Sequence, residues 1–131
     1  MIVVDTNVIA YLFIKGDYTP KAKKLLKTDS EWIAPILWKS EFRNVLALYL
    51  RQGHLTLENS YLLLDEAENF MYESEFEVKS NDVMQLVSIS NCSAYDCEFV
   101  ALAQSFNLKL YTTDKKVLSE FPDLTISLKS I

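Results

Sequence analysis

The amino-acid sequence predicts an α/β fold built on a parallel sheet, and three observations lead to this class. Residues 1–4 are apolar and partly β-branched and run straight into Asp5, as expected of a strand buried on both faces. The apolar residues that follow have helical spacing, so a helix comes directly after the strand. The same arrangement recurs near the other end, where an apolar strand at 108–111 precedes a helical pattern at 115–121.

Local signals predict the remaining elements. Strands are expected at 32–34 and, more weakly, at 76–78, with a final edge strand at 124–128. Helices are expected at 21–28, 36–52 and 57–72, from a cap at 80–82 through Val87, and after the cap residue Ser93. Pro35 is expected to open the helix at 36–52, because its missing N–H is not needed in a first turn. Gly53 is expected just beyond the end of that helix.

Length and composition indicate one domain, residues 1–131. Half of the residues are hydrophobic and only two are glycine, so the chain can bury a core. No apolar run approaches the roughly 20 residues of a membrane span, and the start lacks the pattern of a secretion leader. The two cysteines lack the spacing of a metal site, which favours a reduced, cytoplasmic protein.

The net charge of −5 weighs against a non-specific nucleic-acid binder, because such proteins are usually basic. The basic residues are not spread evenly, however. Four lysines lie between 21 and 27, and Lys39, Arg43 and Arg51 share the predicted helix 36–52. A polyanionic substrate is therefore still compatible with the sequence.

Four acidic residues stand where a purely structural role is hard to argue. Asp5 and Asp114 each follow an apolar strand, at the edge where ligands bind in parallel sheets. Glu41 falls on an apolar stripe of its helix, with Asn44 close to the same line, and Asp96 is in line with the buried face of another helix. Helix capping alone is the competing explanation for Asp5 and Asp96.

Bringing four carboxylates together is unfavourable, because like charges raise one another's pKa. A divalent cation removes that conflict. A set of oxygen ligands without histidine or cysteine favours Mg²⁺ or Mn²⁺ over zinc. Such an ion keeps bound water, which can become a nucleophile.

Four short motifs, in order, resemble the PIN-domain ribonucleases, and in particular the small toxins of toxin–antitoxin pairs. The resemblance covers nearly the whole chain, and the motifs are specific together although each is weak alone. They are Val4-Asp5-Thr6-Asn7, Ser40 to Leu46, Ser93 to Ala103, and Leu110-Tyr111-Thr112-Thr113-Asp114.

The resemblance implies a three-layer α/β/α sandwich with a central parallel sheet, and Mg²⁺- or Mn²⁺-dependent cleavage of RNA. It implies metal ligation and catalysis by Asp5, Glu41, Asp96 and Asp114, with Thr6 and Thr112 in support. It also implies a homodimer and a cognate antitoxin partner. The helix at 57–72 is the candidate contact surface, because its apolar arc is wider than one buried face requires. The acidic net charge departs from what a free RNA-cleaving enzyme would suggest.

Other readings of the same residues are weaker. A haloacid-dehalogenase-like phosphatase needs a second aspartate where Asn7 stands, and a receiver domain needs an acidic pair and a lysine that are absent. A catalytically silent PIN-like module that binds RNA or protein is the remaining alternative. Retention of all four acids weighs against it.

Overall fold

Five parallel strands form one sheet at the centre of the protein, a computed structural model of which describes all residues 1–131. The sheet order is β3-β2-β1-β4-β5. In the central strand, Val3 pairs with Ile33 on one side and with Leu110 on the other. The predicted parallel sheet is confirmed. Its strands are β1 (Ile2–Val4), β2 (Trp32–Pro35), β3 (Glu75–Phe76), β4 (Leu110–Thr112) and β5 (Thr125–Ser127).

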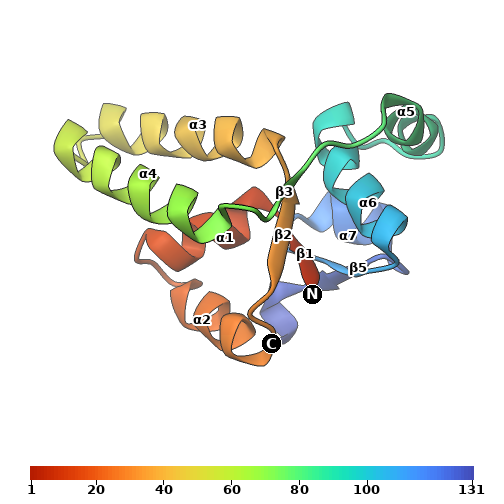
Figure 1. Cartoon of the computed structure of the whole chain (residues 1–131), viewed down its shortest axis with the longest axis horizontal. Coiled ribbons are helices and arrows are strands. Elements are labelled where there is room, and N and C mark those ends of the chain that lie inside the picture. Colours follow the sequence, from red (N-terminus) through yellow and green to blue (C-terminus); the bar gives the residue numbers. More distant parts are fainter.

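Helices cover both faces of this sheet and give the three layers that the sequence predicts (Figure 1). One layer contains α1 (Thr6–Phe13), α2 (Thr19–Thr28), α3 (Leu37–Arg51) and α4 (Leu57–Met71). The other contains α5 (Ser80–Ser88), α6 (Ala94–Phe106) and α7 (Lys115–Glu120). A short 3₁₀ helix, η1 (Leu128–Ser130), packs against α2. None of these helices is both long and apolar enough to cross a membrane.

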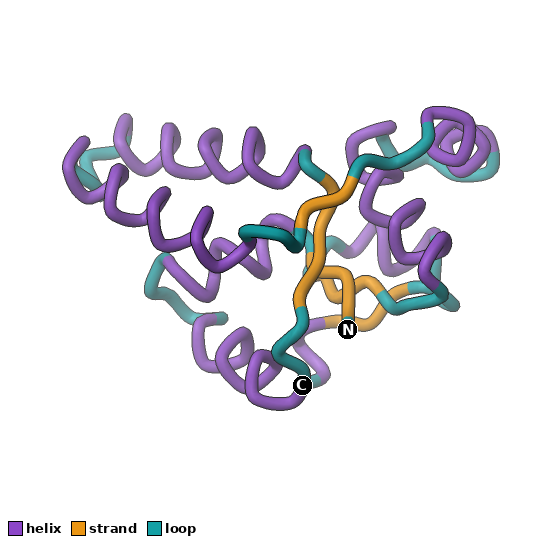
Figure 2. The backbone as a smooth tube through the Cα atoms, viewed as in Figure 1, coloured by secondary structure: helices purple, strands orange, loops and turns teal.

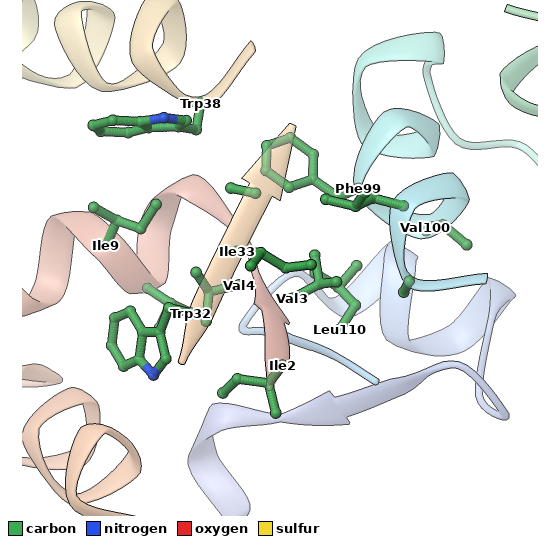
Figure 3. Packing of buried hydrophobic residues seen from close by; sticks show 14 of the residues in the cluster. Ile2, Val3, Val4, Ile9, Trp32, Ile33, Trp38, Phe99, Val100 and Leu110 are labelled. Carbon is green, nitrogen blue, oxygen red and sulfur yellow. The ribbon is translucent and has the colours of Figure 1, made fainter. Parts of the chain in front are cut away.

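The core lies between the layers, on both faces of β1 and β2 (Figure 3). Ile9 from α1 and Trp38 from α3 are fully buried on one side of the sheet, and Val100 from α6 is fully buried on the other. Full burial of a large apolar side chain contributes roughly 1.5–3 kcal/mol each to folding. Strands β1 and β2 contain only apolar residues for this reason, and Asp5 follows directly after the end of β1.

Helices α3 and α4 form a hairpin that projects beyond the sheet, as the tube in Figure 2 shows. Gly53 in the connection has a φ of 77°, which fits its predicted place after the helix. The buried residues of α4 are Ser60, Ala67 and Met71. Its apolar arc is wider than that face, because Leu57, Tyr61 and Leu62 are at least half exposed.

Three local predictions need correction. Pro35 ends β2 instead of opening α3, because the N–H groups that pair with β3 belong to Ala34 and Ile36. The sheet therefore loses nothing from the missing N–H of Pro35. Helix α5 begins at Ser80 with no side-chain cap, and α2 begins two residues early, at Thr19, with Pro20 in its first turn. Cys92 and Cys97 are free and buried.

Candidate active site

The four predicted acids line one cavity of about 400 Å³ at the carboxyl edge of the sheet. Asp5 connects β1 to α1, and Asp114 connects β4 to α7. Glu41 lies in the second turn of α3, and Asp96 lies in the first turn of α6. Two residues that end strands and two that lie on helices are thus brought together from four separate parts of the chain.

Asp5 is both a helix cap and a member of this cavity. Its Oδ1 accepts the backbone N–H of Thr6 at 2.7 Å, and its Oδ2 accepts the hydroxyl of Thr112 at 2.7 Å. The pKa of Asp5 is raised to about 6, mainly by burial and to a smaller extent by the charges of Asp96 and Asp114, although the two hydrogen bonds lower it. Capping of α1 therefore does not exclude Asp5 from the site, because the same carboxylate caps the helix and lines the cavity.

Two threonines connect three of the acids through hydrogen bonds. The hydroxyl of Thr6 donates to Glu41 Oε1 at 2.7 Å, while the backbone N–H of the same residue holds Asp5. The Thr112 hydroxyl donates to Asp5 and accepts the backbone N–H of Asp114 at 3.0 Å. Both threonines are buried. They fix three of the acids relative to one another.

Glu41 lies on the apolar stripe that the sequence predicts, but this stripe lines the cavity and is not the core face of α3. The core face of α3 consists of Trp38, Phe42 and Leu46, one position after the predicted stripe. Glu41 lies with Leu37 and Val45 on the neighbouring face, which lines the cavity. Burial raises the pKa of Glu41, and the charges of Asp5 and Asp96 add to this effect. The apolar residues beside it therefore form a wall of the site, and Asn44 is an exposed part of the same wall.

The capping explanation applies differently to the last two acids. Ser93 caps α6 by accepting the backbone N–H of Asp96 at 3.1 Å, so the Asp96 carboxylate is not the cap. Burial raises the pKa of Asp96, followed by the charge of Asp114. Asp114 does cap α7, since its Oδ1 accepts the N–H groups of Lys116 and Val117 at 2.9 and 3.1 Å. Its other oxygen takes part in neither of these bonds.

Comparison with known proteins places this arrangement in a family. The PIN domain family matches residues 2–124. The chain belongs to the PIN domain family. The chain is also similar to Ribonuclease VapC3 from Pyrobaculum aerophilum, with 28% identity over 127 residues that cover 94% of this chain and 96% of the relative. The predicted family is therefore confirmed.

Solved structures show the same fold. FitAcB from Neisseria gonorrhoeae superposes with a TM-score of 0.79 at 16% identity, over the full length of both chains. A toxin–antitoxin complex from Klebsiella pneumoniae contains a chain that superposes with a TM-score of 0.62 at 16% identity, over 98% of each chain. At this level of identity the structures establish the fold of the PIN domain.

The donor groups of this PIN domain suit a hard divalent cation. None of the four acids forms an ion pair with a lysine or arginine. Burial raises the pKa of three of them, Asp5, Glu41 and Asp96. The cavity offers carboxylate, hydroxyl and amide oxygens and neither histidine nor cysteine. No three acids stand close enough together, as placed, to hold one ion jointly. The fit is therefore one of donor type and location.

Some residues of the cavity were not predicted as site residues. Asn7, Ser40 and Tyr95 line it together with the acids. Each lies next to a residue of the site in one of the four motifs, and that adjacency was the available signal. Lys39, in contrast, faces away from the cavity and pairs with Glu68 and Glu75 at 3.5 and 3.8 Å.

Proposed function

We propose that the protein is a metal-dependent endoribonuclease that hydrolyses RNA phosphodiester bonds. The observation that carries the proposal is four carboxylates, without any protein cation as partner, around one open cavity of a PIN domain. The name of the relative, Ribonuclease VapC3, supports RNA as the substrate. Asp5, Glu41, Asp96 and Asp114 would hold Mg²⁺ or Mn²⁺.

The chain itself contributes the orientation of these ligands. A bound Mg²⁺ or Mn²⁺ supplies a water of lowered pKa and polarises the phosphate. Asp5 is fixed on both oxygens, through Thr6 and Thr112, so it forms the rigid centre of the site. Glu41 and Asp114 are each held through one oxygen in the hydrogen bonds described above. Each can therefore offer its second oxygen to an ion while the first stays fixed.

The test is cleavage of a fluorescent single-stranded RNA by the purified protein, with EDTA and with Mg²⁺ or Mn²⁺. The wild type is expected to cleave only with metal, and Asp96→Asn is expected to lose this activity. Asp17→Asn, an exposed aspartate outside the cavity, is the matched control for loss of one charge and should retain it. No metal-dependent cleavage by the wild type, or equal cleavage by the wild type and Asp96→Asn, would contradict the proposal.

The competing function is an inactive PIN domain that binds RNA or protein. It predicts RNA binding without any metal-dependent cleavage. The raised pKa of Asp5 and the clustering of unpaired acids favour the nuclease, because such a site is costly to maintain without an ion.

We also propose that the protein is the toxin of a toxin–antitoxin pair and binds a cognate antitoxin. The toxin–antitoxin complex with the same fold supports this proposal. Expression of the wild type should slow the growth of a bacterial host, and expression of Asp96→Asn at the same level should not. A cognate antitoxin should restore growth when both are expressed. Slow growth with both variants would show that catalysis is not its cause.

A homodimer is the third part of the proposal. The exposed apolar residues Leu57, Tyr61 and Leu62 of α4 extend the hydrophobic surface beyond the core, and Leu48 of α3 is also half exposed. Exposed apolar surface of this kind is typical of a contact between proteins. Sedimentation of the purified protein at micromolar concentration should show a dimer.

A further inference from the structure

A second cavity, of about 290 Å³, lies beside the acidic one, between α5 and α6. We propose that it binds one nucleobase of an RNA strand whose neighbouring phosphate lies at the four acids. The inference rests on the proposed nuclease function for its substrate class and adds a base-binding subsite to it. Three features carry it: the tyrosine shared by both cavities, the apolar wall, and the type of polar group present.

Tyr95 is the residue that the two cavities share. It is the second residue of α6, directly before Asp96, and 64% of it is exposed. An exposed aromatic ring beside a phosphodiester-cleaving site is a natural platform for a base, since every base has a π-face. The phosphate and its adjoining base are covalently linked, so a strand held at Asp96 brings a base to this ring.

The wall of the second cavity is mainly apolar. Val78, Val83 and Met84 contribute to it from the α5 side, and Met84 is 58% exposed. Methionine sulfur packs favourably against aromatic rings and adapts to irregular shapes. The volume lies just below the roughly 300 Å³ at which sites for drug-sized ligands begin, which suits a single planar base.

The polar groups favour a base over a phosphate. No lysine or arginine lines this cavity, and its one charged group is the carboxylate of Glu98. A carboxylate repels phosphate but accepts hydrogen bonds from the amino groups of cytosine, adenine and guanine. Ser80 adds a hydroxyl that can donate or accept. Uracil lacks an amino group, so the subsite should disfavour it.

The experiment measures RNA binding separately from cleavage. A labelled single-stranded RNA whose backbone resists hydrolysis is titrated with the protein in Mg²⁺, and its anisotropy gives the Kd for the wild type, Tyr95→Ala and Tyr95→Phe. Tyr95→Ala should weaken binding by about 5- to 100-fold, the range typical of aromatic residues that stack on bases, and Tyr95→Phe should stay within about 3-fold. Tyr72→Ala removes another exposed tyrosine, at the end of α4, and should leave Kd unchanged.

Abasic RNAs then show whether the ring contacts a base. Removing one base at a time should reveal one position where the loss equals that of Tyr95→Ala. At that position the abasic change should have no further effect on Tyr95→Ala, which is the signature of direct coupling. Replacing cytosine there by uracil should weaken binding by the wild type, and Glu98→Gln should reduce this difference.

Two results would overturn the subsite. One is an unchanged Kd in Tyr95→Ala. The other is a loss of affinity from each abasic change that is the same in Tyr95→Ala as in the wild type, at every position. If Tyr95→Ala binds RNA normally but loses affinity for a protein partner, the cavity belongs to a protein ligand and the inference is wrong. Cleavage by the wild type would still support the nuclease in either case. Coupling in the binding assay without any cleavage of ordinary RNA in Mg²⁺ or Mn²⁺ would support the subsite and contradict the nuclease.

Discussion

Thr6 and Glu41 lie 35 positions apart in the sequence and are joined by a hydrogen bond of 2.7 Å, from the threonine hydroxyl to Oε1. This bond ties the start of α1 to the second turn of α3. Because the backbone N–H of Thr6 also holds Asp5, one residue positions two of the four acids. The site therefore depends on groups that never need to touch an ion.

Thr6→Val should lower the rate of metal-dependent cleavage by about 10- to 100-fold, as loss of a group that orients a ligand typically does. The volume is nearly unchanged, and the backbone bond to Asp5 remains, so the fold should persist. Thr6→Ser keeps the hydroxyl and should retain most of the activity. The measurement is kcat/KM on a fluorescent RNA at several Mg²⁺ concentrations, and equal values for Thr6→Val and Thr6→Ser would contradict the positioning role.

Thr112→Val should reduce stability as well as activity. The Thr112 hydroxyl is fully buried, donates to Asp5 and accepts from Asp114 N–H, so its removal leaves both groups without that partner. Leaving a buried polar group unsatisfied costs about 1–3 kcal/mol. Urea unfolding in EDTA measures this loss, with Thr112→Ser as the control that keeps the hydroxyl. An unchanged unfolding midpoint in Thr112→Val would show that the two bonds are unimportant for the fold.

The pH dependence of stability should depend on Asp5. Its pKa rises from 3.8 to about 6 on folding, so the metal-free folded protein keeps a proton that the unfolded chain loses. The resulting contribution to stability is complete below about pH 4 and is lost as pH rises through 6, by as much as about 3 kcal/mol. In EDTA, Asp5→Asn should therefore gain stability relative to the wild type between pH 4 and 7. A constant difference across this range would contradict the raised pKa.

Leu62→Glu should convert a dimer to a monomer while the protein stays folded, because Leu62 is 61% exposed and its replacement disturbs no core contact. Sedimentation at micromolar concentration gives the mass of each species. Glu66→Gln, an exposed change on the same helix, is the control. A Leu62→Glu protein that remains dimeric would place the contact on another surface.

The sequence was sufficient to predict the order of the elements and the placement of the four acids around one cavity, while their role in binding metal stays a prediction. Asp5 and Asp114 each follow an apolar strand, and their joint placement follows from the parallel sheet, in which the carboxyl ends of neighbouring strands lie at one edge. The caps at Thr56 and Ser93 were also predictable, since a hydroxyl before a helical pattern satisfies free N–H groups.

The errors arose where neighbouring patterns compete. Helix α3 has two adjacent apolar stripes, and only contact with the rest of the fold shows that Trp38 and Phe42 form the core face while Leu37 and Val45 line the cavity. Pro35 could end a strand or open a helix, and the partner strand β3 decided between them. The hydrogen bonds of Thr6 and Thr112 join distant segments, so no local pattern could reveal them.

The most direct test of the acidic site as a metal site is the thermal stability of Asp96→Asn, measured with EDTA and with Mg²⁺. Without metal, loss of one of several mutually repelling carboxylates should leave the variant as stable as the wild type or more so, because Ser93 still caps α6. With Mg²⁺ at a hundred times the dissociation constant, the wild type should gain about 2.7 kcal/mol, and the variant should gain much less. Asp17→Asn should behave like the wild type. A clear loss of stability in EDTA together with an undiminished gain from Mg²⁺ would show that Asp96 supports the helix and takes no part in binding metal.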